Sequence, residues 1–420
     1  MNNNFVVVES LKIIMIVDSS RPHIAIVGRR NVGKSLLVNS LLNQNVTVVS
    51  DIAGTTTDAI KTKYELLPYG PVVIVDTAGI DDEGELGKNR ITETIKILSS
   101  SDFALVVLDA RETLQSKELE LFAYLDKLQI NYIVAVNKIE FGVNPVLLDE
   151  LKELRMTHFE VSCKEKAGIE ELKRRIIRLL PQDNEPPIIN DLISAGDVVV
   201  MAIPQDETLP PKKLVLSQVH IIRESIDENA VVIVCPEKEI IKTINSLKTF
   251  PDLVIVDNNI FSAIKSEIPD KIKLTTYSII LSRHKGDLSL FIKSLNKINE
   301  LKNDDKILIA EVCSHHKVDD NSDSIKISKW LKSKTKKNLN IEIFNGYDLP
   351  DNLSEYKLIV HCGGCLLTHR AMQTRINEAR LMDVAVVNYG VINSYIDGAI
   401  PRALVPFTDA FAEWGKARSK

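Results

Sequence analysis

Three short motifs near the start of the chain carry residue types suited to phosphate and magnesium chemistry. The first, G-R-R-N-V-G-K-S, runs from Gly28 to Ser35 and fits the pattern G-x-x-x-x-G-K-[ST]. In this pattern glycines let the backbone wrap a phosphate, so that amide N–H groups and a helix N-terminus face the anion. We expect Gly28 and Gly33 to shape the loop. Lys34 would then reach the β- and γ-phosphates, and the Ser35 hydroxyl would bind Mg²⁺.

The other two motifs supply the remaining parts of a nucleotide switch. V-V-I-V-D-T-A-G ends at Gly79 and places Asp76 at the end of an apolar run. We expect the Asp76 carboxylate to hold Mg²⁺ through water and the Gly79 N–H to meet a γ-phosphate. Between this motif and the first lies G-T-T-T-D, which contains Thr56. A threonine in such a loop binds Mg²⁺ only when the γ-phosphate is present, which predicts an order–disorder switch.

A second set of residues, near the C-terminus, has the types that bind soft metal ions. C-S-H and H-C-G-G-C each follow an apolar run directly. We expect Cys313, Cys362 and Cys365 to be ligands, with His315 and His361 as further candidates. Three thiolates suit Zn²⁺ or an iron–sulfur cluster, and the residues alone leave both open. A redox disulfide between the last two cysteines is the non-metal alternative, but it leaves the first cysteine unexplained.

Alternating strands and helices must position both sets. Apolar runs that read as buried strands end at the phosphate motifs, and further runs such as F-A-L-V-V-L-D-A and N-Y-I-V-A-V-N follow them. This alternation predicts an α/β protein, with a doubly wound P-loop sheet followed by two smaller α/β domains with mainly parallel sheets. The carboxyl ends of parallel strands lie at one edge of a sheet, so the phosphate motifs should meet there. The same argument brings the two cysteine motifs together.

The chain divides into four expected segments. Residues 1–20 form an N-terminal extension in which Met15 is an alternative start, and residues 21–182 form the nucleotide-binding domain. After the proline-rich break L-P-Q-D-N-E-P-P, residues 188–268 form a middle domain without phosphate or metal motifs. We expect it to dimerise, because a small sheet leaves edges to cover. Residues 269–420 form the domain that carries the cysteine motifs, and L-T-T-Y-S is expected as the first of its five strands.

Composition and charge narrow the class of protein. The 420 residues are 45% hydrophobic and 26% charged, which excludes a disordered or low-complexity chain. With 52 Lys and Arg against 57 Asp and Glu, the net charge is −5 and disfavours a nucleic-acid-binding chain. No apolar run is long enough to span a membrane, and the start lacks the features of a signal peptide. Five cysteines, an odd and sparse number, indicate a reducing compartment and hence a cytoplasmic protein.

The order of the nucleotide motifs resembles the small GTPase superfamily and, within it, the bacterial Era/TrmE/EngA branch. N-K-I-E stands where this branch carries the guanine-reading motif N-K-x-D. The resemblance implies that the base is bound by Asn137, Lys138, Glu140, Ser162, Cys163 and Lys164. Because Glu140 is one methylene longer than the aspartate of the pattern, we expect it to weaken base recognition without redirecting it. The thiol of Cys163 and that of Cys235 are expected to be packed rather than reactive.

The same resemblance bears on the rate of hydrolysis. Ile80 follows D-T-A-G where the Ras type has a water-orienting glutamine, and an aliphatic side chain cannot orient water. Asn31 resembles the asparagine that binds K⁺ in TrmE-like GTPases, although asparagine is also common at tight turns. The resemblance therefore implies slow, Mg²⁺-dependent GTP hydrolysis that K⁺ stimulates.

From about residue 21 to residue 415 the chain resembles the [FeFe]-hydrogenase maturation GTPases, the HydF family. The motifs that carry this resemblance are P-P-K-K-L-V-L-S-Q, Y-S-I-I-L-S-R-H-K-G-D-L, C-S-H-H and H-C-G-G-C. The resemblance implies a homodimeric scaffold and carrier that binds a [4Fe–4S] cluster through the three C-terminal cysteines. It also implies that the carrier receives a di-iron precursor from two radical-SAM maturases and delivers it to apo-[FeFe]-hydrogenase.

The alternative from the GTPase branch is an RNA- or ribosome-associated GTPase with a structural zinc site. That function calls for a basic RNA-binding module, which the net-acidic chain does not show. The fourth ligand of a cluster is not fixed by the sequence. Besides the two histidines of the cysteine motifs, Asp191 and Asp197 near the start of the middle domain are candidates.

Overall fold

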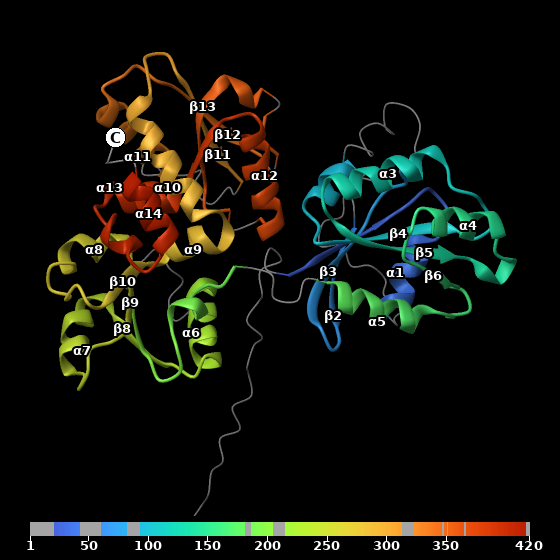
Figure 1. The fold of residues 1–420 in the computed structure, drawn as a ribbon, viewed down its shortest axis with the longest axis horizontal. Coiled ribbons are helices and arrows are strands. Elements are labelled where there is room, and N and C mark those ends of the chain that lie inside the picture. Colours follow the sequence, from blue (N-terminus) through green and yellow to red (C-terminus); the bar gives the residue numbers. More distant parts are fainter. Residues whose placement is uncertain are drawn as a thin grey trace, which may run out of the picture.

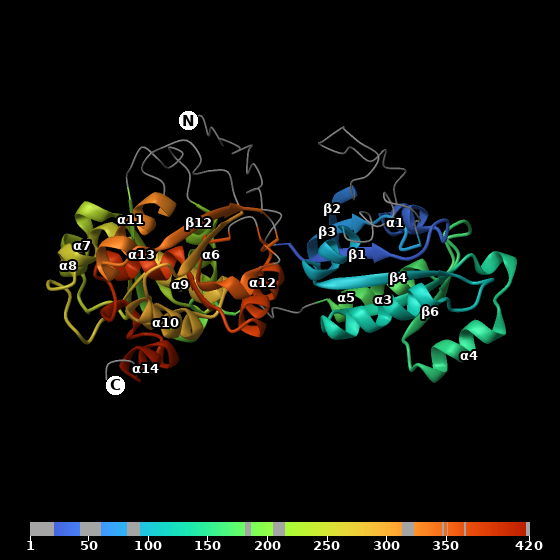
Figure 2. The ribbon, with the colours of Figure 1, turned by 90° about the horizontal axis from the view of Figure 1, so that it is seen from above.

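The computed structural model describes residues 21–42, 60–81, 93–180, 186–204, 215–312, 323–346, 348–350, 352–364 and 367–416, apart from the side chain of Leu216. Within these ranges the chain is built of three β-sheets flanked by helices, which confirms the α/β class. In both views the first sheet and its helices stand to one side, and the other two sheets share one body (Figures 1 and 2). Every helix in the described ranges is too short or too polar to span a lipid bilayer.

The first unit, residues 21–180, contains a six-stranded sheet of order β2-β3-β1-β4-β5-β6. Its strands are β1 (His23–Val27), β2 (Ile60–Leu66), β3 (Gly70–Asp76), β4 (Phe103–Asp109), β5 (Asn131–Asn137) and β6 (His158–Val161). Its helices are α1 (Lys34–Leu42), residues 93–99, α3 (Ser116–Lys127), α4 (Pro145–Glu153) and α5 (Ile169–Leu179). Only β2 is antiparallel to its neighbour; all other pairs are parallel. The sheet is therefore mainly parallel, as expected.

Burial explains why these runs become central strands. All residues of β1 and β4 are buried, as expected for strands covered on both faces by helices. Alternate side chains enter two separate apolar clusters, one on each face of the sheet. The amphipathic helices α3 and α5 place leucines in these clusters and expose most of their charged residues, although Glu118 of α3 is buried. The carboxyl ends of β1, β3, β4 and β5 consequently share one edge of the sheet, where the phosphate motifs begin.

The second unit contains a four-stranded parallel sheet of order β10-β9-β7-β8. Its strands are β7 (Val198–Ile203), β8 (Val231–Pro236), β9 (Leu253–Val256) and β10 (Lys273–Thr276), and its helices are α6 (Leu216–Asp227), α7 (Ile240–Ser246), α8 (Asn258–Ile264) and α9 (Tyr277–Lys285). Cys235 in β8 is buried, and burial raises the pKa of its thiol, which supports a packed role.

The third unit contains a parallel sheet of order β12-β11-β13-β14. Its strands are β11 (Lys306–Glu311), β12 (Asn340–Asn345), β13 (Tyr356–His361) and β14 (Ala385–Asn388). Its helices are α10 (Leu288–Lys297), α11 (Asp323–Thr335), α12 (His369–Leu381), α13 (Tyr389–Ile396) and α14 (Thr408–Lys416). Short 3₁₀ turns occur at Ile139–Phe141, Asn190–Leu192, Glu237–Glu239, Ile298–Glu300, Leu353–Glu355 and Arg402–Leu404.

The position of β10 corrects one expectation from the sequence. A boundary between residues 268 and 269 would separate β10 from β9, to which it is hydrogen-bonded along its whole length. The third sheet accordingly has four strands in the described residues rather than the expected five. The pattern of strand then helix is the same in both units, so it does not show which sheet a strand joins. We retain three units as a proposal and place the second boundary after α9.

The second and third units share one hydrophobic core, whose buried residues in the described part of the chain extend from Ile188 to Trp414. A buried polar network also links them. Ser394 Oγ donates to Oδ1 of Asn258 at 3.0 Å, and Asn388 Nδ2 donates to Oγ of Ser282 at 2.9 Å. Because buried hydrogen-bonded groups are costly to separate, these two units should unfold together.

We predict that Gly390→Ala in α13 lowers the free energy of unfolding of this shared body by about 1–3 kcal/mol. A Cβ at this position would lie 2.4 Å from Ser282 Oγ and 2.8 Å from the Ser278 carbonyl oxygen. The matched control is Gly415→Ala in α14, where a Cβ meets nothing within 4 Å. Urea unfolding followed by tryptophan fluorescence measures both variants, because Trp330 and Trp414 both lie in the shared body. Equal stability of the two variants would contradict the close packing of α13 on α9.

Candidate functional site

The loop between β1 and α1 has the shape that phosphate binding requires. Gly28 has φ +152° and Gly33 has φ +99°, values that other residues rarely adopt. A Cβ on Gly28 would lie 2.4 Å from the carbonyl oxygen of Val107. One on Gly33 would lie 2.3 Å from Nδ2 of Asn137. Asn31, between the two glycines, is also left-handed with φ 59°, so the loop curls tightly ahead of the helix.

Lysine, serine and aspartate side chains converge beside this loop. Lys34 is buried, and its ammonium donates to the carbonyl oxygens of Gly28 at 3.0 Å and Arg29 at 2.8 Å. Ser35 Oγ donates to Oδ2 of Asp76 at 2.6 Å. Burial raises the pKa of Asp76, and the Ser35 hydrogen bond and the Lys34 charge oppose this effect. The second carboxylate oxygen of Asp76 is buried without a hydrogen-bond partner, so it is available to a hard cation such as Mg²⁺.

The D-T-A-G segment lies against the phosphate-binding loop. Thr77 Oγ1 donates to the carbonyl oxygen of Ile26 at 2.9 Å and thereby holds the segment to β1. Gly79 approaches so closely that a Cβ there would lie 2.5 Å from Cγ of Arg30. Ile80 is only 7% exposed and packs in the apolar cluster on one face of the sheet. Its side chain therefore points into the core and does not face a water at the phosphate site.

A buried amide joins the phosphate-binding loop to the loop expected to bind the base. Asn137 Nδ2 donates to the carbonyl oxygen of Val32 at 2.9 Å, and its Oδ1 accepts from the amide of Cys163 at 3.2 Å. Lys138 follows in a left-handed conformation with φ 70°. Its ammonium donates to Oδ2 of Asp109 at 2.8 Å. Three segments that are far apart in the sequence thus meet at the carboxyl edge of the sheet.

Glu140 presents a carboxylate to the same edge. A hydrogen bond with Ser162 is the main cause that lowers the pKa of Glu140, and the charges of Lys164 and Lys138 act in the same direction. Oε2 of Glu140 is buried without a hydrogen-bond partner. This spare acceptor suits a ligand that offers N–H donors. Burial raises the pKa of the neighbouring Cys163 thiol to about 11, which supports its interpretation as a packed thiol.

Sequence reasoning missed a charged group beside this site. Asp109, the last residue of β4, accepts hydrogen bonds from Arg111 at 2.8 and 2.9 Å and from Lys138. Burial opposes ionisation, but these bonds hold the pKa of Asp109 well below its usual range. Arg111 and Lys164 also lie over the ring of Phe141, at 5.4 and 5.6 Å from its centre. The available signal was an acidic residue at the carboxyl end of a wholly apolar strand.

The cysteine motifs follow neighbouring strands. β11 and β13 are parallel and adjacent, with Ala310 opposite His361, which confirms the expected strand arrangement. His361 is 1% exposed, its Nδ1 lies 2.6 Å from the carbonyl oxygen of Cys362, and its Nε2 is buried without a partner. Burial, together with the charge of Arg375, lowers the pKa of His361 to about 3, so the ring is neutral. Gly364, with φ +64°, turns the chain after the first cysteine of the pair.

Four expected site residues lie outside the described residues: Thr56, Cys313, His315 and Cys365. Their roles, and those of the other site residues, stay predictions. Within the described ranges, no three His, Cys, Asp or Glu side chains lie close enough together to hold a metal ion. Of the candidate fourth ligands, Asp191 forms an ion pair with Arg283 at 2.7 Å. Asp197 accepts from the amide of Ser194 at 2.9 Å.

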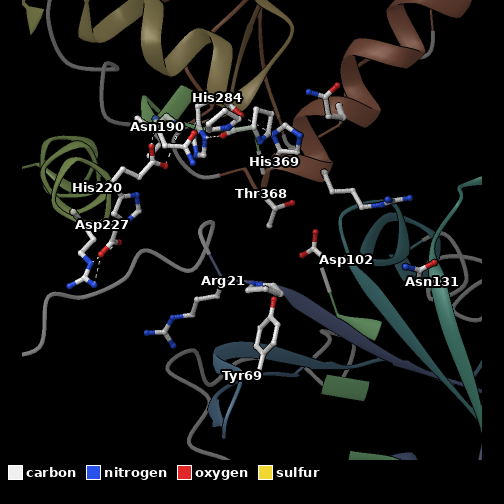
Figure 3. Close-up of a pocket in the computed structure, with 18 of the residues that line it drawn as sticks. Arg21, Tyr69, Asp102, Asn131, Asn190, His220, Asp227, His284, Thr368 and His369 are labelled. Atoms are coloured by element: carbon white, nitrogen blue, oxygen red, sulfur yellow. Dashed lines mark hydrogen bonds and ion pairs between the residues drawn. The ribbon is translucent and has the colours of Figure 1, made fainter. Parts of the chain in front are cut away.

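A polar cleft of about 900 Å³ lies where the first unit meets the other two (Figure 3). Arg21 and Asp102 line it from the first unit, and His220, His284 and His369 line it from the opposite side. His369 opens α12, and its Nδ1 lies 3.0 Å from the carbonyl oxygen of His284. The cleft is at the amino edge of the first sheet, away from the phosphate-binding loop.

The first unit is similar in sequence to curated bacterial GTPases. It is 41% identical over 161 residues to the tRNA modification GTPase MnmE of Thermoanaerobacter sp. (strain X514), a match that covers 37% of this chain and 34% of the relative. It is 38% identical over 120 residues to the GTPase Der of Limosilactobacillus reuteri, with 28% of each protein covered. The chain thus spans about a third of the length of the curated relatives it matches.

Solved structures with similarity to this chain include a bacterial GTP-binding protein. An Era protein of Aquifex aeolicus bound to GDP and aluminium fluoride is 22% identical, with 52% of this chain and 95% of that one covered and a TM-score of 0.34. The family model for 50S ribosome-binding GTPases matches residues 23–138, which contain the phosphate-binding loop and the N-K motif.

Two further family models match the rest of the chain. Residues 188–286 match the hydrogen maturase F dimerisation domain, and residues 289–406 match its tetramerisation domain. These two models together cover more than half of the chain, and the GTPase model precedes them in the expected order. The chain belongs to the hydrogen maturase F family, and a domain that matches GTPases precedes its two maturase domains.

Proposed function

We propose that this chain is a GTP-binding scaffold and carrier for assembly and delivery of the di-iron subcluster of [FeFe]-hydrogenase. It would bind a [4Fe–4S] cluster, accept the di-iron precursor from two radical-SAM maturases and pass it to the apo-hydrogenase. The observation that supports this proposal is the adjacency of β11 and β13, the two strands that the cysteine motifs directly follow in the sequence, in a chain of this family. We also propose a cytoplasmic location, since free thiols and an iron–sulfur centre need a reducing compartment.

In this proposal, different residues of the first unit have different roles in GTP hydrolysis. Lys34 would neutralise the β- and γ-phosphates, and Gly79 would donate its N–H to the γ-phosphate. Ser35, Asp76 and Thr56 would hold Mg²⁺. The unpartnered Asp76 oxygen beside the Ser35 hydroxyl supports this arrangement. With Ile80 buried in the core, turnover by this unit alone should be slow.

Cys362 and His361, which belong to the second cysteine motif, are compatible with a role beside an iron–sulfur centre. Cys362 lies at the carboxyl end of β13, and the neighbouring imidazole of His361 is neutral with a buried, unpartnered nitrogen. Cys313, Cys362 and Cys365 would hold three irons, and the fourth iron would give the precursor a place to dock. His315 or His361 would serve as the exchangeable fourth ligand or would tune the cluster.

A tRNA-modifying or ribosome-associated GTPase with structural zinc is the second candidate, and the similarity to MnmE and Der favours it. That similarity covers only 37% and 28% of this chain, however, so it leaves most of the chain unexplained. The two hydrogen maturase models over the remaining units favour the carrier.

We propose that the homodimer forms through β8. Of the two edge strands of the middle sheet, β10 is covered by the turn Arg402–Leu404, to which Thr275 Oγ1 donates a hydrogen bond. β8 instead exposes apolar side chains, among them Val231 and Val234. An exposed apolar edge strand pairs readily with a second copy of itself.

The cluster proposal predicts that anaerobic reconstitution with iron and sulfide gives about four irons per chain and a reduced-state EPR signal. Cys313→Ala should lose both, because two thiolates cannot hold the cube. Cys235→Ala is the matched control and should keep both, since this buried thiol lies in the middle sheet. Stoichiometric zinc in the native protein, or a full cluster in Cys313→Ala, would contradict the proposal.

The assignment of K⁺ to Asn31 predicts that GTP turnover is faster in K⁺ than in Na⁺. The left-handed φ of Asn31 suits a turn residue as well as a cation ligand, so the test must separate the two. Asn31→Gly keeps that conformation but removes the amide oxygen. Steady-state turnover of this variant should respond equally to both cations. K⁺ stimulation that survives in Asn31→Gly would remove the cation from the mechanism.

Base selection should depend on Glu140. Its spare oxygen can accept from the N–H groups of guanine, whereas adenine offers an acceptor at N1. We therefore predict that GTP competes far better than ATP and that Glu140→Asp tightens GTP binding several-fold, because it restores the shorter side chain. Glu165→Asp, an exposed neighbour, is the control and should change nothing. Competition with labelled GDP measures these affinities, and equal competition by ATP would exclude guanine selection.

Dimerisation through β8 predicts that Val234→Lys reduces the mass of the assembly by about half in multi-angle light scattering. Val234 is 46% exposed at the sheet edge, and a lysine there would place a charge in the paired interface. Val146→Lys is the matched control, because Val146 is similarly exposed on α4 of the first unit. An unchanged mass for Val234→Lys would show that another surface makes the dimer.

A further inference from the structure

A carboxylate occupies one corner of the phosphate-binding loop. Oδ1 of Asp81 accepts a hydrogen bond from the backbone N–H of Arg30 at 2.7 Å. Arg30 is the third residue of the G-R-R-N-V-G-K-S loop, whose amides serve to bind phosphate oxygens. Asp81 follows two residues after the glycine of D-T-A-G. The carboxylate of Asp81 is therefore bound by an amide of the loop whose amides are expected to bind the phosphates of a nucleotide.

The backbone before Asp81 is fixed on two sides. The amide of Ile80 donates to the carbonyl oxygen of Gly28 at 3.3 Å, and the side chain of Ile80 is buried in the core. Gly79 is in close contact with the loop, since a Cβ there would lie 2.9 Å from both the Arg30 nitrogen and Oδ1 of Asp81. The Asp81 carboxylate, the Arg30 amide and Gly79 thus meet at one point.

The same point lies beside the place that a third phosphate would take. Gly79 is the residue expected to donate to a γ-phosphate, and the Lys34 ammonium, the other group expected to meet that phosphate, lies 3.0 Å from the Gly28 carbonyl oxygen. A γ-phosphate adds negative charge close to the Asp81 carboxylate, whereas a nucleoside diphosphate ends one phosphate short of it. Like charges a few ångströms apart repel even in water.

We propose that Asp81 is a specificity-determining residue that weakens the binding of GTP relative to GDP. The γ-phosphate of GTP is repelled by the negative charge of Asp81 and breaks the hydrogen bond between Asp81 and the Arg30 amide. GDP lacks this phosphate and has neither effect. Nearby Arg29 does not cancel this charge, because its guanidinium is engaged by Glu118 at 2.8 Å and by Glu112. This role goes beyond the proposed carrier function, since it depends only on the GTPase unit.

The test compares dissociation constants for GDP and for a non-hydrolysable GTP analogue on the full-length chain. Asp81→Asn keeps an oxygen that can accept from the Arg30 amide but removes the charge. We expect the ratio of the analogue's Kd to the GDP Kd to fall by roughly threefold to tenfold. The GDP Kd itself should stay within about twofold, which also shows that the variant is folded. Asp81→Ala should change the ratio in the same direction.

Asp126→Asn is the matched control, because it removes a carboxylate from α3, remote from the loop, and should leave the ratio unchanged. Two results would overturn the proposal: an unchanged ratio in Asp81→Asn, or an equal shift of both dissociation constants.

Discussion

The buried amide side chain of Asn137 joins the phosphate-binding loop to the loop proposed to bind the base. One end of this buried group donates to the phosphate-binding loop at Val32, and the other accepts from the base-side loop at Cys163. Gly33 packs directly against it, with no room for a Cβ. A side chain bonded at both ends in this way fixes the distance between the two loops, because a shift of either loop would leave a buried polar atom unsatisfied. This arrangement is possible because the carboxyl ends of the parallel strands lie at the same edge of the sheet.

The shared body of the second and third units gives the cysteine motifs a rigid support. Its single core and its buried Ser–Asn network leave little freedom between the two sheets. The first unit contacts this body at the start of α12 and at Asp348. Thr368 caps that helix and also donates to the carbonyl oxygen of Ser100 at 3.2 Å, and Lys96 forms an ion pair with Asp348 at 2.6 Å. Contacts from the GTPase unit therefore reach the helix that directly follows the H-C-G-G-C motif.

Much of this architecture follows from local sequence patterns. The G-x-x-x-x-G-K-[ST] motif, the buried strands and the shared edge of β11 and β13 depend on spacing and hydrophobicity, which the sequence displays directly. The sheet to which β10 belongs could not be predicted in the same way, because the sequence of a strand does not show which neighbouring strand it is hydrogen-bonded to. The roles of Asp109 and Asp81 were missed for a related reason. Each is defined by a partner distant in the chain, Lys138 for the first and the Arg30 amide for the second.

Delivery of a di-iron precursor from this chain to a hydrogenase can be tested directly by measuring activation of the hydrogenase. The protein would be isolated anaerobically from cells that also produce both radical-SAM maturases, then incubated with purified apo-[FeFe]-hydrogenase, and hydrogen evolution would be followed. The account predicts that the wild-type chain activates the hydrogenase and that a Cys362→Ala chain does not. Absence of activation by a wild-type chain that holds its full cluster, or equal activation by Cys362→Ala, would contradict the account.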